Sequence, residues 1–125
     1  MAVHSDFNVI IFREHLGDNA GDINTDFPFK GRSSTKKNFR IEGSPVDDAF
    51  LLINHNNVNS SSHTIEINSR DLPWLDILDA DDKFTTQMKL IPPGFLKRGN
   101  NTIQIHQKGA DNFIVMEAVV HWREE

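Results

Sequence analysis

Apolar and polar residues alternate along three short stretches of this chain. Residues 63–68 and 102–106 each carry two isoleucines separated by one polar residue. Residues 84–90 follow the same pattern, with the apolar side chains from Phe84 to Leu90 on one face. Such alternation is typical of β-strands with one face on a core and the other in water. The pattern therefore predicts three half-buried strands, with the apolar face of each directed inward.

Two longer runs, residues 49–54 and 113–122, are almost continuously apolar. Strands that are covered on both faces have this composition, so we expect these two to be central in a sheet. Residues 7–12 and 38–41 predict further strands, and one turn of helix fits residues 72–78. Strands otherwise recur without intervening helices, and this order predicts an antiparallel β-sandwich.

Residues 91–107, with the sequence IPPGFLKRGNNTIQIHQ, join two of these strands. The two prolines cannot donate hydrogen bonds to a strand ladder, so they end the first strand. Phe95 and Leu96 are apolar inside this connection, and we expect them to tuck under one end of the sandwich. Gly99 and Asn100 tolerate a positive φ and let the chain reverse before the next strand. We interpret this stretch as a structural turn.

The same stretch resembles an element of galactose-binding-like jelly-roll domains, in which a leucine, a basic residue and Gly-x-Asn precede an alternating strand. In those domains, segments similar to AFLLINHNNV and HTIEINSRDL come earlier, and a strand similar to DNFIVMEAVVHW closes the sandwich. The resemblance covers residues 48–122. It implies an all-β, antiparallel jelly-roll β-sandwich of the galactose-binding-domain type, which we expect to span residues 1–125 as one domain. Carbohydrate-binding modules and accessory domains of glycoside hydrolases belong to this superfamily.

Charge and composition narrow the range of partners. The net charge of −5 argues against nucleic acid, because phosphate binding needs a basic surface. The chain has no cysteine, which excludes disulfides and thiol catalysis. There is no signal-peptide pattern and no apolar run of the roughly 20 residues that a membrane span needs. We therefore expect a soluble, cytoplasmic protein without membrane insertion.

Catalytic motifs are weak. Ser62 and His63 are neighbours on a predicted strand, so their side chains point to opposite faces and are badly placed for nucleophilic catalysis. Carboxylates are abundant in residues 76–82, but a glycosidase needs two of them held across a cleft. A small sandwich offers no deep cleft, and exposed turns explain these residues. The sequence therefore predicts that the protein is not an enzyme.

Hard oxygen donors gather in one segment near the N-terminus, namely Asp18, Asp22, Asn24 and Asp26. Their spacing begins like an EF-hand loop, but Phe27 stands in place of the required glycine and Ser33 in place of the final glutamate. A looser calcium site and a solvated turn both fit the segment, and no other cofactor is predicted. His55 and His63 flank one loop, where they fit either a zinc pair or histidines at strand ends.

Surface recognition is the function class that these observations leave. Sugar sites combine an aromatic face with groups that hydrogen-bond to paired hydroxyls. One predicted carbohydrate site at a loop end comprises Trp74, Arg70, Asp71, Asp76 and Asp48. A second candidate loop end comprises His55, Asn57, His63 and Arg98. Trp74 also fits as a core residue beneath the long connection that contains it.

A structural or protein-interaction role is the alternative to carbohydrate binding. In this interpretation a sheet face or edge pairs with another copy of the chain or with a larger assembly. The missing signal peptide favours it, because carbohydrate-binding modules usually act outside the cell. The contact residues would be exposed apolar side chains on polar faces, and we expect Ile10, Phe12 or Ile91 in that position.

Overall fold

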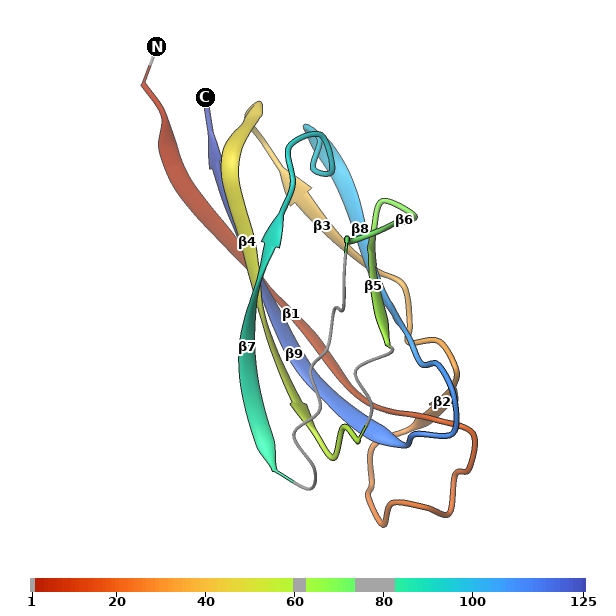
Figure 1. The fold of residues 1–125 in the computed structure, drawn as a ribbon. Helices are drawn as coiled ribbons and strands as arrows, with labels where there is room; N and C mark the ends of the chain where they lie inside the picture. The colour runs from red at the N-terminus through yellow and green to blue at the C-terminus, as the bar shows by residue number, and fades with distance from the viewer. Residues whose placement is uncertain (1, 60–62, 74–82) are drawn as a thin grey trace.

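A computed structural model describes residues 2–59, 63–73 and 83–125 and contains strands but no helix within these ranges (Figure 1). The strands are β1 (His4–Leu16), β2 (Phe29–Gly31), β3 (Lys37–Ile41), β4 (Pro45–Asn56), β5 (Thr64–Ile67), β6 (Arg70–Asp71), β7 (Phe84–Ile91), β8 (Gly99–His106) and β9 (Phe113–Glu124). The expected turn of helix at residues 72–78 falls almost entirely outside the described residues. No helix capable of crossing a membrane occurs in the described part of the chain.

The strands form two sheets that face one another (Figure 1). One sheet has the order β2-β1-β9-β4-β7 and the other has the order β3-β8-β5-β6. All pairings are antiparallel except a short parallel contact between β1 and β2. The fold is an all-β jelly-roll sandwich, as the sequence predicts. The two continuously apolar runs lie in β4 and β9, which are both internal strands of the larger sheet.

The core lies between the two sheets and follows the predicted alternation. Ile65, Ile67, Ile103 and Ile105 have no exposed surface, and they come from adjacent strands of the smaller sheet. Leu51 on β4 opposes them from the larger sheet within the same buried cluster. Each such side chain stabilises the fold by about 1.5–3 kcal/mol when it leaves water. The alternating stretches therefore hold the two sheets together.

In β7 the apolar face points outward, contrary to the sequence prediction. Phe84, Met88 and Leu90 are 59–69% exposed. The register pairs Leu51 of β4 with Lys89, so the polar residues of β7 occupy the face directed between the sheets. Successive side chains on a strand point to opposite faces, so the placement of one residue determines the face of every other residue in the strand. β7 is the edge strand of its sheet, and it contributes fewer buried apolar side chains to the core than the internal strands do.

The expected contact residues also lie on the inner face of their strands. Ile10, Phe12 and Ile91 are at most 5% exposed and belong to the core. The odd-numbered residues Phe7 and Val9 of β1 are exposed instead. The prediction that Ile10, Phe12 or Ile91 is an exposed contact residue is therefore wrong.

The connection between β7 and β8 has the predicted form. Phe95 is buried and Leu96 packs against the core, so both close one end of the sandwich. Gly99 has a φ of 93°, as the predicted reversal requires. Asn101, the asparagine of the Gly-x-Asn element, also closes this loop. Its buried side-chain amide accepts from Lys97 N at 3.0 Å and donates to Lys97 O at 2.8 Å.

Candidate functional site

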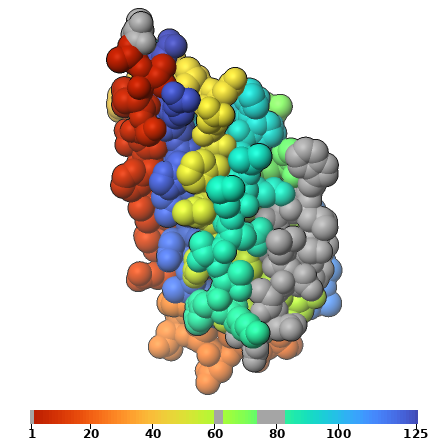
Figure 2. Space-filling model, turned by 60° about the vertical axis from the view of Figure 1, so that its left-hand side comes forward, coloured from red at the N-terminus to blue at the C-terminus, as the bar shows by residue number. Residues whose placement is uncertain are grey.

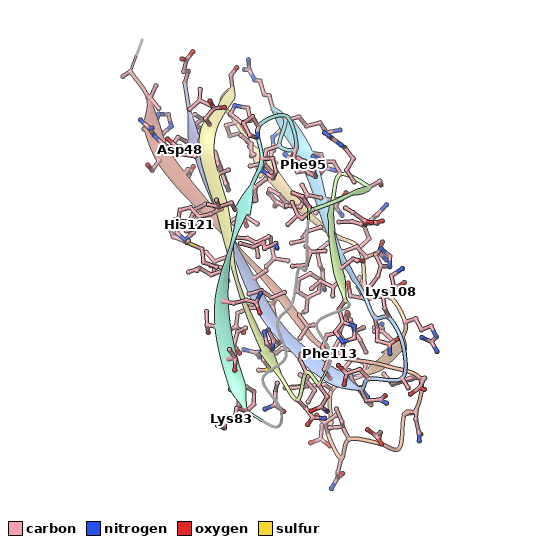
Figure 3. The ribbon with its side chains drawn as sticks, viewed as in Figure 1. Asp48, Lys83, Phe95, Lys108, Phe113 and His121 are labelled. Atoms are coloured by element: carbon pink, nitrogen blue, oxygen red, sulfur yellow. The ribbon has the colours of Figure 1, made fainter. Side chains whose placement is uncertain are left out.

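The two ends of the sandwich carry different sets of polar residues (Figure 3). The register of β4 with β7 places Ala49 beside Ile91 at one end and His55 beside Thr85 at the other. We call these the Asp48 end and the His63 end. In Figure 3 Asp48 and Phe95 lie toward the first, and Lys83 and Phe113 toward the second.

Arg98 does not lie with the other members of its predicted site. It belongs to the connection that follows Ile91, and Gly99 pairs with Ile41 of β3, so Arg98 is at the Asp48 end. His55 and His63 are at the opposite end. Sequence patterns alone assign the loop after Pro93 to the wrong end, because they do not contain the pairing of β7 with β4.

Arg70 of the first predicted site is at the Asp48 end and has a structural role. Its guanidinium lies 4.2 Å from the ring centroid of Phe95, and its Nη1 donates to Gly94 O at 3.1 Å. Asp71 follows it in the short strand β6 and is exposed. These contacts fasten the β5–β6 hairpin to the connection that closes this end. Trp74 and Asp76, the other two residues predicted beside Arg70, lie outside the described residues.

Asp48 stands in an irregular part of β4. The register between β4 and β9 shifts between Val46 and Phe50, and Asp48 has a φ of 75°. Its Oδ2 accepts a hydrogen bond from Arg123 Nη1 at 3.2 Å. A strand bulge of this kind often re-aims side chains near binding sites. Here it presents two consecutive carboxylates, those of Asp47 and Asp48, at the end of the sandwich.

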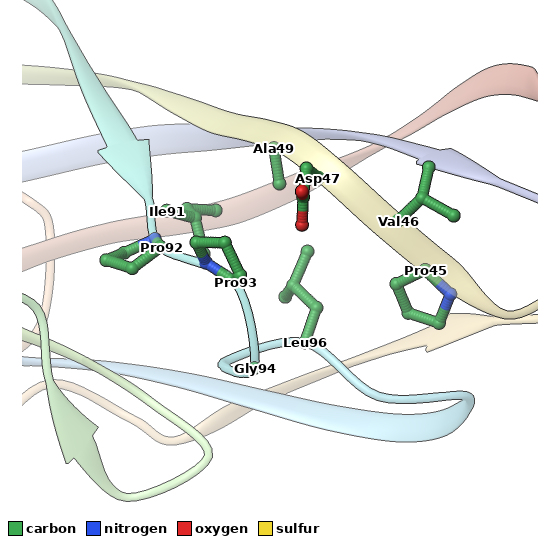
Figure 4. Close-up of a pocket in the computed structure, with 9 residues that line it drawn as sticks. All are labelled: Pro45, Val46, Asp47, Ala49, Ile91, Pro92, Pro93, Gly94 and Leu96. Carbon is green, nitrogen blue, oxygen red and sulfur yellow. The ribbon is translucent and has the colours of Figure 1, made fainter.

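A groove of about 590 Å³ runs beside these carboxylates along the end of β7. The residues that matter for its chemistry are Asp47, Asp48, Pro73, Leu90, Pro92 and Pro93. We call it the β7-edge groove. A smaller cavity of about 50 Å³ adjoins it, and there the Asp47 side chain extends from β4 toward Pro93 and Leu96 (Figure 4). The sequence identifies the prolines as strand terminators, but it does not indicate that they also wall a groove.

At the His63 end the polar side chains are buried. His63 Nε2 lies 2.7 Å from Asp111 Oδ2, and Lys108 N donates to His63 Nδ1 at 3.0 Å. Because Nδ1 accepts, Nε2 carries the proton and donates to the carboxylate. The His63 side chain has no exposed surface. Both ring nitrogens are therefore engaged in joining loops, and this pair does not have the open geometry of a general base.

His55 lies in the same buried region. Its Nε2 is 2.9 Å from Gln87 Oε1, while its Nδ1 has no hydrogen-bond partner within the described part of the chain. Burial lowers the pKa of His55, the hydrogen bond to Gln87 opposes that shift, and the nearby His63 adds to it. Asn57, predicted beside it, donates through Nδ2 to Asn112 O at 3.0 Å. His55 and His63 are buried, and Asn57 is half-buried and bonded to the start of β9.

The predicted calcium segment forms the connection after β1. Asp18 Oδ1 accepts from Asn112 Nδ2 at 2.9 Å, which ties the segment to the start of β9. Among the described residues, no group of three or more histidine or acidic side chains is placed to hold a metal ion. Asp18, Asp22 and Asp26 therefore do not form such a group. Calcium binding by this segment stays a prediction.

Two solved structures share the fold. The structure of dimeric latent PorU from Porphyromonas gingivalis matches the whole chain with a TM-score of 0.63 at 8% identity, and the match covers 13% of the PorU chain. The CBM36-1 domain of a multidomain xylanase from the hindgut metagenome of Trinervitermes trinervoides matches 92% of this chain and 96% of its own, with a TM-score of 0.58 at 12% identity. No curated protein matches the sequence. At these identities the likenesses establish the β-sandwich fold.

The sequence also matches a family model over nearly all of its length. The matched region, residues 4–124, begins with β1 and ends with β9, so it takes in both sheets and both ends of the sandwich. The chain therefore belongs to DUF7383, a family of unknown function.

Proposed function

We propose that the protein is a non-catalytic module that binds carbohydrate in the β7-edge groove. The observation that carries the proposal is the groove itself, which joins two consecutive carboxylates to an apolar wall. Its volume of about 590 Å³ falls within the range of roughly 300–1,000 Å³ that is usual for ligand sites. The fold shared with a carbohydrate-binding module supports the same class of ligand.

The lining suits the two kinds of surface that a sugar presents. The carboxylates of Asp47 and Asp48 accept hydrogen bonds from neighbouring hydroxyls, and charged acceptors form stronger bonds than neutral ones. Pro92 and Pro93 offer rigid apolar rings to the C–H face of a pyranose. Trp74 directly follows Pro73 of the groove wall in the sequence, and we propose that it supplies the stacking aromatic.

The state of the acidic and basic groups supports a non-catalytic role. The buried pair of His63 and Asp111 has its hydrogen-bonding nitrogens occupied. The two groove carboxylates are adjacent in one strand, whereas glycoside hydrolysis needs carboxyl groups on opposite sides of the scissile bond. Binding without bond cleavage is the chemistry that this arrangement supports.

Isothermal titration calorimetry with xylo-, cello-, manno- and galacto-oligosaccharides tests the proposal, in calcium and in EDTA. We expect one of these classes to bind, and Asp47→Asn to weaken that binding about tenfold or more through loss of a charge-assisted hydrogen bond. Trp74→Ala is expected to weaken it similarly. Asp6→Asn removes the same charge from β1, away from the groove, and serves as the matched control.

Two results would contradict the proposal in different ways. If no oligosaccharide binds in either condition, the protein is not a carbohydrate-binding module. If one binds equally well to the wild type, Asp47→Asn and Trp74→Ala, the ligand does not occupy the β7-edge groove. A difference between calcium and EDTA would show whether sugar binding depends on calcium.

A further inference from the structure

The outward surface of the larger sheet carries most of the exposed apolar side chains. We call this surface the outer face. Figure 2 shows β1, β9, β4 and β7 side by side on it. It includes six of the large apolar residues that are 45–69% exposed, namely Phe7, Val9, Ile11, Phe84, Met88 and Leu90. Half-buried Phe50, Leu52 and Val119 fill the space between them.

The strand registers arrange these residues in rows that cross four strands. One row is Phe7, His121, Phe50 and Leu90, and the next is Val9, Val119, Leu52 and Met88. The two rows contain no Asp, Glu, Lys or Arg. A two-row apolar stripe on an otherwise polar protein is unlike the scattered apolar residues of ordinary surfaces, and patches of this kind mark interaction sites.

The aromatic rings of the first row stack on one another. The His121 ring centroid lies 4.6 Å from that of Phe50, with an interplanar angle of 12°, and 5.7 Å from that of Phe7. The ring faces are therefore turned toward each other within the row. A sugar needs a free ring face for stacking, so this surface is suited to packing against side chains.

The extent of the outer face matches what a dimer requires. The six exposed side chains leave on the order of 600 Å² of apolar surface in water, against roughly 800 Å² per partner in a standard interface. The half-buried residues between them add to this area. Two sheets that pack face to face also reproduce the aligned sandwich packing already used inside the molecule.

The charges at the margins of the outer face favour a second copy of the chain as the partner. In β9, Arg123 lies beyond the first row and Glu117 beyond the second. A second copy can be placed by a two-fold axis that lies between the two rows and runs parallel to them. Rotation about this axis lays β9 of the second copy over β9 of the first, with the two strands antiparallel. His121 then faces Val119 of the second copy, and Arg123 faces its Glu117. In this arrangement the positive and negative positions of β9 on the two copies face each other.

We propose that the outer face is the interface of a homodimer, in which the β9 strands cross antiparallel and two ion pairs join Arg123 of each copy to Glu117 of the other. The Glu117 side chain has no hydrogen-bond or ion-pair partner among the described residues of its own chain, so its carboxylate is available for this contact. A dimer is a function beyond carbohydrate binding, because the partner is a second copy of the chain. The outer face and the β7-edge groove adjoin at Met88 and Leu90, and Arg123 also bonds to Asp48 of the groove at 3.2 Å, so Val9 in β1 is the position that tests the dimer apart from the groove.

Sedimentation equilibrium tests the dimer at protein concentrations on the order of 100 µM, well above a micromolar dissociation constant. We expect a mass twice the 14.2 kDa of the chain. Val9→Lys places a charge in the centre of the outer face and should weaken dimerisation at least tenfold, since unpaired charge is costly in a buried interface. Asn100→Lys, at an exposed position of β8 in the other sheet, is the matched control and should leave the dimer intact.

A charge exchange tests the arrangement. Arg123→Glu alone should weaken the dimer about tenfold through repulsion by Glu117 of the second copy. Arg123→Glu combined with Glu117→Arg should restore dimerisation to within about threefold of the wild type. A monomer at all concentrations, or a dimer that Val9→Lys leaves intact, overturns the proposal. An exchange that fails to restore the dimer overturns the antiparallel arrangement. Sugar binding is measured separately by calorimetry, so a failed dimer and a failed sugar site are distinguishable.

Discussion

The two ends of the sandwich use the same kinds of side chain for opposite purposes. At the His63 end, Asp111 is 9% exposed and bonds to His63 and to the backbone of Asn59. At the Asp48 end, Asp47 is exposed beside a groove. Burial makes a carboxylate depend on its partners, because an unpaired charge away from water is costly. The same group in water keeps its hydrogen-bonding capacity for a ligand. Burial therefore distinguishes the His63 end, which stabilises the fold, from the Asp48 end, which we propose binds carbohydrate.

The largest expected effect comes from removing the buried acid. Asp111→Ala leaves His63 Nε2 and Asn59 N without their acceptor, and we expect a loss of about 3–5 kcal/mol in the free energy of unfolding. Asp47→Ala at the open end should change it by no more than about 0.5 kcal/mol. Urea unfolding followed by tryptophan fluorescence measures both variants. Equal losses at the two ends would remove the distinction between them.

A smaller loss of stability is expected from a buried residue at the Asp48 end. Asn101 has no exposed surface and holds Lys97 N, Lys97 O and the Asn68 side chain together. Asn101→Ala should cost about 2–3 kcal/mol, since it strands buried backbone groups. Asn100→Ala, at the exposed neighbour, should cost no more than about 0.5 kcal/mol. The same urea experiment applies. If the two variants are equally stable, the connection between β7 and β8 is not closed by Asn101.

The smallest effect concerns pH and again belongs to the buried end. Burial lowers the pKa of His55 below its ordinary 6.5, so the unfolded chain binds more protons than the folded protein once the pH falls through that value. His55 therefore costs no stability above this range, and stability decreases as the pH falls below it. The slope from this one group is at most about 1.4 kcal/mol per pH unit.

His55→Gln isolates this contribution. The free energy of unfolding of the wild type should fall more steeply between pH 7 and pH 5 than that of the variant, with the difference in the direction just derived. Urea unfolding at several pH values provides the measurement. Parallel pH profiles would mean that His55 titrates alike in the folded and unfolded states, which its burial would not explain.

Much of the fold is legible in local patterns. The alternating isoleucines of β5 and β8 and the apolar runs of β4 and β9 are recognisable because each follows from which faces of its strand are covered. The burial of Phe95 can be predicted for the same reason, since an apolar side chain in a polar loop is expected to pack against the core. These features depend on burial, and the order of apolar and polar residues within one strand reflects which of its faces are buried.

The candidate site is harder to predict because it depends on long-range pairing. Sequence patterns place Arg98 and His55 together, although the register of β7 with β4 puts them at opposite ends. The face of β7 is reversed for a related reason, because only its neighbour in the sheet determines which side meets the core. The β7-edge groove joins residues from three separate segments, and no local pattern identifies such a meeting point.

The pairing of β1 with β9 joins the first strand of the fold to the last, from His4 opposite Glu124 to Leu16 opposite Phe113. The ribosome makes β1 before β9, so β1 stays without this neighbour until β9 has also emerged. During that time Phe7 and Val9 are exposed on an unpaired strand of the kind that other chains can capture. The larger sheet can close only once β9 is available to pair with β1, and closing so long a loop makes the step slow.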